Sequence, residues 1–202
     1  MRDTHYVFDF DRTLFDDDML IASLMKEFIA QGATEEGLLH AYAKIAVQNE
    51  LWSPWRWAEY TFGHVSDAIR SRIDFLHKQT SNMVYGDVRP FLEGIGRSTK
   101  SVLSYGDPQT QNEKIAHSGI AHYFSDITIT QDPQKTSDFL RYSGARRVVF
   151  VDDRGPIIDA VKSMHPHITC ICIMRPGSAY NHEPSMRADK VISSLADLNE
   201  AR

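Results

Sequence analysis

The sequence predicts an α/β protein with a doubly wound parallel sheet, and three observations support this prediction. Short runs rich in β-branched and aromatic residues recur along the chain, with helical patterns between them. These runs are apolar almost throughout, which is typical of strands covered on both faces. The helices between them favour parallel pairing through right-handed crossovers. The expected strands are His5–Phe10, Ser101–Tyr105, Asp126–Thr130, Arg147–Val151 and Ile168–Met174.

One long stretch after the first expected strand breaks this alternation, because it contains helical patterns and no convincing strand. Apolar residues repeat at helical spacing in the segments 21–29, 38–45 and 69–76. Residues that favour helix starts precede four expected helices; they are Asp17 or Asp18, Thr34, Ser53 with Pro54, and Ser66. We therefore expect a helical segment, residues 16–86, inserted into an α/β core of residues 1–15 and 87–202.

Two carboxylates lie two residues apart where the first expected strand ends. Asp9 and Asp11 follow a run of apolar side chains. In parallel sheets, ligands bind beyond the carboxyl ends of the strands, and paired acids there need a cation or a shared proton. A hard divalent ion such as Mg²⁺ suits a ligand set made only of oxygen. The pattern predicts a metal-dependent site; the alternative is a pair of solvated loop acids.

The string Asp9-Phe10-Asp11-Arg12-Thr13 matches a DxDxT motif and resembles the haloacid dehalogenase-like (HAD) hydrolase superfamily. The resemblance implies that Asp9 is a nucleophile that forms an aspartyl-phosphate, and that Asp11 is first a general acid and then a base. It also implies that Asp9 and the main-chain carbonyl of Asp11 bind Mg²⁺. Arg12 stands where many members have glycine, and it either contacts the substrate or faces solvent.

Two further short matches follow in the order of the family's motifs. Ser104, Tyr105 and Gly106 end the second expected strand, and the resemblance implies that the Ser104 hydroxyl and the backbone N–H groups after it bind a phosphoryl oxygen. Lys135 opens an expected helix and would neutralise clustered carboxylates and bind the phosphoryl group. Taken alone, the serine is typical of a turn and the lysine of a solvated surface.

A second pair of acids, Asp152 and Asp153, follows the fourth expected strand and resembles the family's fourth motif. The resemblance implies that Asp153 binds Mg²⁺ and that Asp152 supports it, although the two roles could be exchanged. Acids that cap the following helix are the alternative. Four matches in family order, at successive strand or loop positions, argue against chance agreement.

Together the matches imply a Rossmann-like core with a helical cap of the C1 type, and a Mg²⁺-dependent hydrolase of small phosphate monoesters. Three alternatives stay open: a phosphosugar mutase, a non-catalytic module that binds a phosphorylated ligand or protein, and Schiff-base chemistry from Lys26, Lys44 or Lys78. A dehalogenase is disfavoured, because such members normally lack the second carboxylate that Asp11 provides.

Several residues of the insertion and the histidines have roles that the motifs leave open. Trp52, Trp55 and Trp57 either form the core of the insertion or stack on a ligand, and we favour the core. The acids at 16–18 are expected to form a helix-start cluster. The nine histidines are expected at the surface, because they lack the spacing of a zinc site backed by a third ligand.

The composition is that of an ordinary globular protein, since 42% of the residues are apolar. The net charge of −5 argues against a nucleic-acid polymer or an anionic membrane as partner. Cys170 and Cys172 are too few for a disulfide framework and are expected in the core. No apolar run approaches the roughly 20 residues of a membrane helix, and the N-terminus lacks a signal pattern, so a cytoplasmic location is expected.

Overall fold

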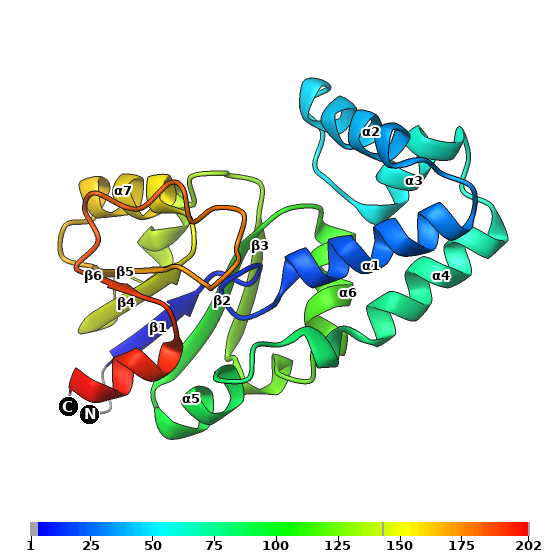
Figure 1. The fold of residues 1–202 in the computed structure, drawn as a ribbon. Coiled ribbons are helices and arrows are strands. Elements are labelled where there is room, and N and C mark those ends of the chain that lie inside the picture. The colour runs from blue at the N-terminus through cyan, green and yellow to red at the C-terminus, as the bar shows by residue number, and fades with distance from the viewer. Residues whose placement is uncertain (1–3, 143, 202) are drawn as a thin grey trace.

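The computed structural model describes residues 4–142 and 144–201 of the chain. Within these residues Figure 1 shows one sheet with helices on both faces, and its six strands run parallel in the order β3-β2-β1-β4-β5-β6. The predicted fold class is confirmed. The strands are β1 (Thr4–Phe8), β2 (Thr99–Tyr105), β3 (Asp126–Thr130), β4 (Arg147–Asp152), β5 (Thr169–Ile173) and β6 (Lys190–Ile192).

Five of these strands coincide with segments that the sequence predicts. The exception is β6, whose three residues are too few to form a recognisable pattern. It is a strand because it pairs with β5 at the edge of the sheet, and such pairing is a tertiary contact that periodicity does not reveal.

The central strand β1 shows why helices cover both faces. Val7 and Phe8 are adjacent and fully buried, because successive side chains of a strand point to opposite faces. Phe8 belongs to a cluster with Phe91 and Ile115, whereas Val7 packs in a separate cluster with Ile158. The corresponding helices are α5 (Val88–Gly94), α6 (Pro108–His117) and α7 (Gly155–Met164); Figure 1 shows α5 and α7 on opposite sides of the sheet. Short 3₁₀ helices are η1 (Thr80–Met83), η2 (Ala121–Tyr123), η3 (Thr136–Tyr142) and η4 (Leu195–Ala201).

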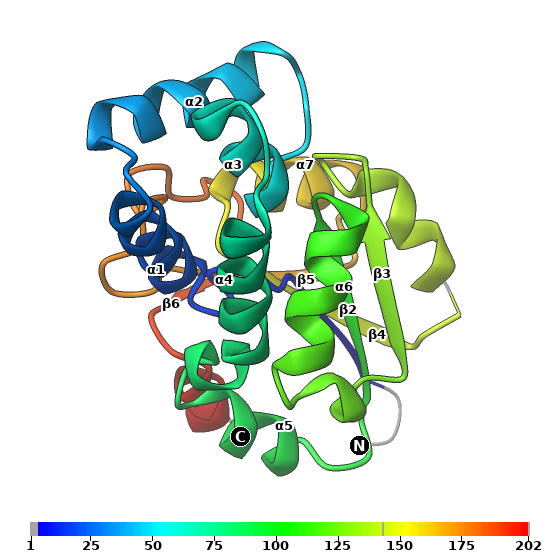
Figure 2. The same cartoon turned by 90° about the vertical axis from the view of Figure 1, so that its right-hand side faces the viewer.

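Four helices lie between β1 and α5, where the sequence predicts a helical insertion. They are α1 (Asp17–Ala30), α2 (Glu35–Val47), α3 (Pro54–Phe62) and α4 (Asp67–Lys78). Figure 1 shows them extending away from the sheet, with α2 and α3 farthest from it. Figure 2 shows α4 beside α6, so the insertion also contacts the core. We refer to residues 16–86 as the proposed cap.

Side chains cap the starts of all four helices. Thr34, Ser53 and Ser66 each accept a hydrogen bond from the backbone N–H three residues later, at 3.1, 3.1 and 3.3 Å, as the sequence predicts. For α1 the cap is Asp16, which accepts the same kind of bond at 3.0 Å. The prediction that residue 17 or 18 caps this helix is wrong, because both carboxylates lie in the first turn and form ion pairs instead.

Trp57 lies at the centre of the proposed cap and is 1% exposed. Its Nε1–H donates to the carbonyl of Leu38 at 2.9 Å, so the one polar atom of the ring is satisfied in the interior. The ring packs edge-on against Phe28 and Tyr42, with centroids 5.4 and 5.9 Å apart. For this tryptophan the core interpretation is confirmed.

His77 departs from the prediction that the histidines lie at the surface. It is 2% exposed, and its Nδ1 lies 2.7 Å from Glu113 Oε2. The prediction is wrong for this residue because His77 on α4 packs against α6, where the proposed cap meets the core. Burial lowers the pKa of His77, and the Glu113 carboxylate partly opposes this change.

Cys170 and Cys172 of β5 are buried free thiols in the core, as the sequence predicts. In the part of the chain that the structure describes, every helix is too short or too polar to span a bilayer.

Candidate active site

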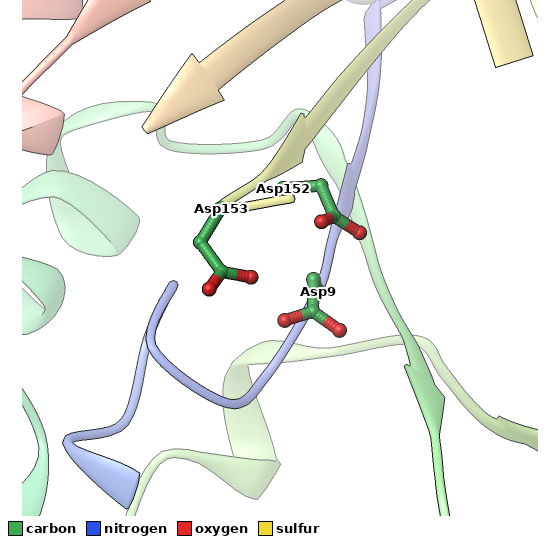
Figure 3. A group of neighbouring side chains, drawn as sticks. All are labelled: Asp9, Asp152 and Asp153. Atoms are coloured by element: carbon green, nitrogen blue, oxygen red, sulfur yellow. The ribbon is translucent and has the colours of Figure 1, made fainter. Parts of the chain in front are cut away.

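The carboxyl ends of β1 and β4 lie next to each other and gather three acids that are distant in sequence. Asp9 directly follows β1, and its N–H donates to the carbonyl of Val151 at 2.9 Å. Asp152 is the last residue of β4, and Asp153 follows it. Figure 3 shows the three carboxyl groups close together, and one oxygen of each lies within 4.8 Å of the others. The pairing of β1 with β4 therefore unites the first and fourth motifs.

Lys135 reaches this acidic cluster from the loop after β3. Its Nζ lies 2.5 Å from Asp9 Oδ1 and 2.8 Å from Asp152 Oδ2, and its side chain is buried. The backbone of Lys135 has a positive φ of 60°, and η3 begins at the next residue. The expected helix is thus a 3₁₀ helix that starts just after the lysine.

Burial governs the acidity of the cluster. Burial raises the pKa of Asp9 to about 7, although the Lys135 ammonium group opposes this change. Burial and then the neighbouring Asp152 carboxylate raise the pKa of Asp153 well above its ordinary range. One ammonium group does not balance three buried carboxylates, so the cluster favours binding of a further cation.

The oxygens of the cluster fit a divalent metal ion. Both oxygens of Asp152 are engaged, since Oδ2 contacts Lys135 and Oδ1 accepts from the N–H of Arg154 at 2.8 Å. Asp153 Oδ2, in contrast, is buried and has no hydrogen-bond partner within residues 4–142 and 144–201. A set of carboxylate oxygens is the kind of site that Mg²⁺ prefers. These contacts favour Asp9 and Asp153 as direct ligands and Asp152 as the residue that holds Lys135.

The carboxylate of Asp11 lies apart from this cluster and contacts α6. Its Oδ1 lies 2.5 Å from Lys114 Nζ, and its Oδ2 accepts from Gln111 Nε2 at 2.7 Å. The same lysine contacts Asp17 Oδ1 at 3.0 Å. Burial and the Asp17 carboxylate raise the pKa of Asp11, and Lys114 opposes them. Asp11 still lines the same cavity as Asp9, so the two acids of the first motif face a common space.

Arg12 is buried, so the alternative in which it faces solvent is wrong. Its guanidinium group lies 3.4 Å from Asp17 and 2.6 Å from Asp18, at the start of α1. It also lies over the ring of Tyr180, 4.8 Å from the centroid. Arg12 has a positive φ of 56°, which turns the chain after Asp11 toward the proposed cap. The residue lines the cavity but is already paired with two acids of the protein.

The second predicted motif lies at the end of β2. Tyr105 and Gly106 line the cavity, whereas Ser104, which directly precedes them, is buried and is not part of the lining. The Ser104 hydroxyl is buried and has no hydrogen-bond partner in the part of the chain that the structure describes. An unsatisfied buried hydroxyl costs stability, which is consistent with a ligand that supplies the missing partner.

A cavity of about 270 Å³ connects these residues with the proposed cap. Trp52, with Tyr42, lines it from the cap side, and Arg154 and Tyr180 line it from the core. Trp52 is only partly buried, so the tryptophan cluster divides into a core residue, Trp57, and a cavity residue. Arg154 Nε is buried and none of the described residues forms a hydrogen bond with it, and the guanidinium group lies 4.4 Å from the centre of the Tyr180 ring. The cavity thus offers an arginine to an anionic group.

Comparison with solved structures identifies the fold. No protein-family model and no curated protein matches the sequence. One matching structure is that of a Burkholderia xenovorans LB400 protein assigned to the haloacid dehalogenase-like hydrolases. The match spans 100% of this chain and 97% of the other chain, with a TM-score of 0.80 and 22% sequence identity. This chain has the HAD-like fold. Two other structures with this fold match across nearly their full lengths.

The first of these two is the HAD-hydrolase YfnB from Bacillus subtilis, whose structure is described as bound to magnesium. The match spans 99% of this chain and 98% of the YfnB chain, with a TM-score of 0.65 and 12% sequence identity. The second is the L-2-haloacid dehalogenase from Xanthobacter autotrophicus, which also covers 99% and 98%, with a TM-score of 0.63 and 17% identity. The HAD-like fold is therefore shared with a haloacid dehalogenase and with proteins described only as hydrolases, so the fold leaves the reaction open and the side chains of the site must indicate it.

The sequence alone does not identify Gln111 and Lys114, which contact Asp11. Both lie on α6, three residues apart and therefore on one face of the helix. The available signal is a lysine next to Ile115, on the helix that directly follows the second motif. Only the packing of α6 against the loop after β1 shows that this face points toward Asp11.

Proposed function

We propose that this protein is a Mg²⁺-dependent hydrolase of small phosphate monoesters that acts through an aspartyl-phosphate. The observation that carries the proposal is the combination of Asp9 in a buried cluster with Lys135 and a second carboxylate, Asp11, on the same cavity. In a dehalogenase the halide leaves as a stable anion and needs no proton, whereas in a phosphatase a group must protonate the leaving oxygen. Asp11 is the residue that favours phosphate ester hydrolysis.

In the first step an oxygen of Asp9 attacks phosphorus, and the bond between phosphorus and the ester oxygen breaks. Asp11 gives its proton to the departing oxygen, so an alcohol leaves and Asp11 becomes a carboxylate. In the second step Asp11 takes a proton from water as the water oxygen attacks phosphorus. The bond to Asp9 breaks, inorganic phosphate leaves, and Asp11 is again protonated.

The other residues of the site orient the phosphoryl group and balance charge. Lys135 contacts Asp9 and would bind a phosphoryl oxygen as a point charge. The Ser104 hydroxyl, which has no hydrogen-bond partner among the described residues, would donate to another oxygen. Bound Mg²⁺, held by Asp9 and Asp153 with the Asp11 carbonyl, would offset the negative charge of the carboxylates and of the phosphoryl group.

The proposed cap would bind the rest of the substrate. Trp52 and Tyr42 provide aromatic surface on the cap side of the cavity, and Arg154 provides positive charge from the core. The three cap lysines of the Schiff-base alternative, Lys26, Lys44 and Lys78, are exposed and lie outside the cavity lining. The cavity geometry therefore favours the phosphatase over that alternative.

The test is phosphate release from a panel of phosphorylated metabolites and p-nitrophenyl phosphate, with Mg²⁺ and with EDTA. We expect Mg²⁺-dependent release by the wild-type protein and loss of at least about 10³-fold in Asp9→Asn, because a carboxamide does not replace the nucleophile. Asp16→Asn, which changes an acid outside the cluster, is the matched control. Wild-type release no greater than that of Asp9→Asn on every substrate would refute the proposal.

Two other outcomes would assign a different chemistry. An isomerised phosphosugar, formed with little inorganic phosphate, would indicate a mutase. Halide release from 2-haloacids, without Mg²⁺ dependence, would indicate a dehalogenase. Both products are measured on the same protein preparations.

A further inference from the structure

Two side chains of α6 hold the carboxylate of Asp11 from both of its oxygens. Lys114 Nζ lies 2.5 Å from Oδ1, and Gln111 Nε2 donates to Oδ2 at 2.7 Å. Lys114 is 1% exposed and Gln111 is 4% exposed, so neither side chain is free to move into solvent. The contacts fix both the position and the plane of this carboxylate.

The glycine that follows β2 leaves room for this arrangement. A Cβ atom added at Gly106 would lie 2.7 Å from Gln111 Nε2 and 3.2 Å from Gln111 Cγ. Gln111 also donates to the carbonyl of Tyr105 at 3.1 Å, which anchors its amide against the end of β2. The close approach of the amide to the backbone therefore requires glycine at residue 106, and the site is built to admit Gln111.

Lys114 connects Asp11 to the proposed cap as well. Its Nζ lies 3.0 Å from Oδ1 of Asp17, the first residue of α1. One buried ammonium group thus joins an acid of the first motif to the helix that opens the insertion. A buried lysine with two carboxylate partners is held much more firmly than an exposed ion pair, because neither charge is well solvated if a contact breaks.

We propose that Gln111 and Lys114 are positioning residues that orient the carboxyl group of Asp11 toward the leaving oxygen of the substrate. The proposal rests on the proposed function, in which Asp11 transfers the proton. Each carboxylate oxygen has a second lone pair, so the two contacts orient the group without occupying every position that a proton needs. Correct orientation matters because proton transfer requires the acid within hydrogen-bond reach of the leaving oxygen.

A positioning role predicts that the loss of activity depends on the leaving group, whereas a purely structural role predicts an equal loss for all leaving groups. A substrate with a poor leaving group needs the proton, whereas p-nitrophenolate leaves without much help. Removing the positioning contacts must therefore slow phenyl phosphate much more than p-nitrophenyl phosphate, although the two substrates differ little in size. General acid catalysis contributes about 10²–10⁴-fold, which sets the size of the effect.

The experiment measures kcat and KM for a series of substituted phenyl phosphates with Lys114→Met, Lys114→Arg and Gln111→Leu. We expect Lys114→Met to lower kcat/KM for phenyl phosphate by at least about 100-fold and for p-nitrophenyl phosphate by less than about 5-fold, mainly through kcat. Lys114→Arg should restore most of the loss. Gln111→Leu, which leaves Lys114 and Asp17 paired, should show the same leaving-group dependence even if Lys114→Met fails to fold.

Gln109→Leu is the matched control for Gln111→Leu, because it makes the same change at an exposed position of α6. The positioning role alone would be overturned if kcat/KM falls equally for all leaving groups, or if it falls in neither Gln111→Leu nor Lys114→Met. Absence of Mg²⁺-dependent phosphate release by the wild-type protein would refute the proposed function, and the positioning role with it.

Discussion

Arg175 is expected to be one of the most stabilising polar residues of the fold, and replacing it with methionine tests how the loop after β1 is held. The side chain is 3% exposed. Its Nε and Nη2 donate to the carbonyl of Thr13 at 3.2 and 2.7 Å, and its Nη1 lies 2.7 Å from Asp87 Oδ2. The guanidinium group also lies over the ring of Tyr85, 4.2 Å from the centroid. It therefore ties the motif loop to the segment where the chain returns from the proposed cap.

The magnitude follows from these contacts. A hydrogen bond that involves a charged group contributes about 1.5–3 kcal/mol, and the contacts with Asp87 and with the Thr13 carbonyl count as two such interactions. Stacking of the cation on Tyr85 adds about 0.5–2 kcal/mol. Methionine retains part of the apolar packing, so we expect Arg175→Met to lower the free energy of unfolding by about 3–5 kcal/mol, which also matches the usual cost of breaking a buried ion pair.

Urea unfolding of the wild type, Arg175→Met, Asp87→Asn and the double variant measures this effect and its origin. Because Arg175 and Asp87 interact directly, the double variant should lose at least about 1 kcal/mol less than the sum of the single variants. A loss below about 1 kcal/mol in Arg175→Met, or additive losses in the cycle, would refute the reasoning.

The same variants have a defined pH dependence. Burial alone would raise the pKa of Asp87, but hydrogen bonds from Arg175 and Ser194 outweigh it and lower the pKa overall. A carboxyl group with a lowered folded-state pKa contributes stability above its ordinary value of about 3.8, and that stability is lost as the pH falls through the folded-state pKa. The difference in unfolding free energy between wild type and Arg175→Met should therefore be largest near neutral pH and shrink below about pH 4.

Three further predictions concern packing and reactivity. Trp57→Ala should lower the free energy of unfolding by about 3–5 kcal/mol, because it leaves a cavity in the centre of the proposed cap and an unpaired Leu38 carbonyl. Urea unfolding measures this loss, and a loss under about 1 kcal/mol would contradict the burial of the ring. By the same assay, Gly155→Ala should lower the free energy of unfolding by about 1–3 kcal/mol or more, because the added Cβ would lie 2.5 Å from the backbone nitrogen of Ser185. Gly94→Ala is the control and should change stability little, because its Cβ would meet no atom of the described residues within 4 Å. Burial raises the pKa of the Cys170 thiol to about 12, so the native protein at pH 8 should react with Ellman's reagent only as fast as it unfolds. In urea both thiols should react at once, whereas rapid reaction of the native protein would show that β5 is accessible.

Much of the fold could be predicted from the sequence because it depends on local patterns. The apolar runs locate five strands, and the capping residues Thr34, Ser53 and Ser66 locate three helix starts, since each of these signals acts within a few residues. β6 lacks such a signal, because pairing with β5 defines it. The sequence pattern places the cap of α1 one or two residues too late, because three consecutive acids compete for this position. Ion pairs of Asp17 and Asp18 leave Asp16 to cap the helix.

The candidate site divides in the same way. The motifs indicate Asp9, Asp11, Lys135 and the pair at 152–153 as chemical groups, because paired acids at strand ends are costly without a function. The sequence leaves open which acid of the pair would bind a metal ion, and hydrogen bonds from Lys135 and a backbone N–H to Asp152 favour Asp153. The partners of Asp11 come from α6, about a hundred residues away, so no local pattern indicates them.

The sequence by itself therefore determined the parallel α/β architecture, the place of the helical insertion and the kinds of chemical groups that the strands present. These features follow from hydrophobic periodicity, capping and the residue types at strand ends, which are all short-range properties. Only the tertiary structure decided which acids share a cation, how the carboxylate of Asp11 is oriented, and which tryptophan faces the cavity. Those outcomes depend on strand order and on the packing of α6 and the proposed cap against the core, where residues far apart in the chain exclude water from the same charges.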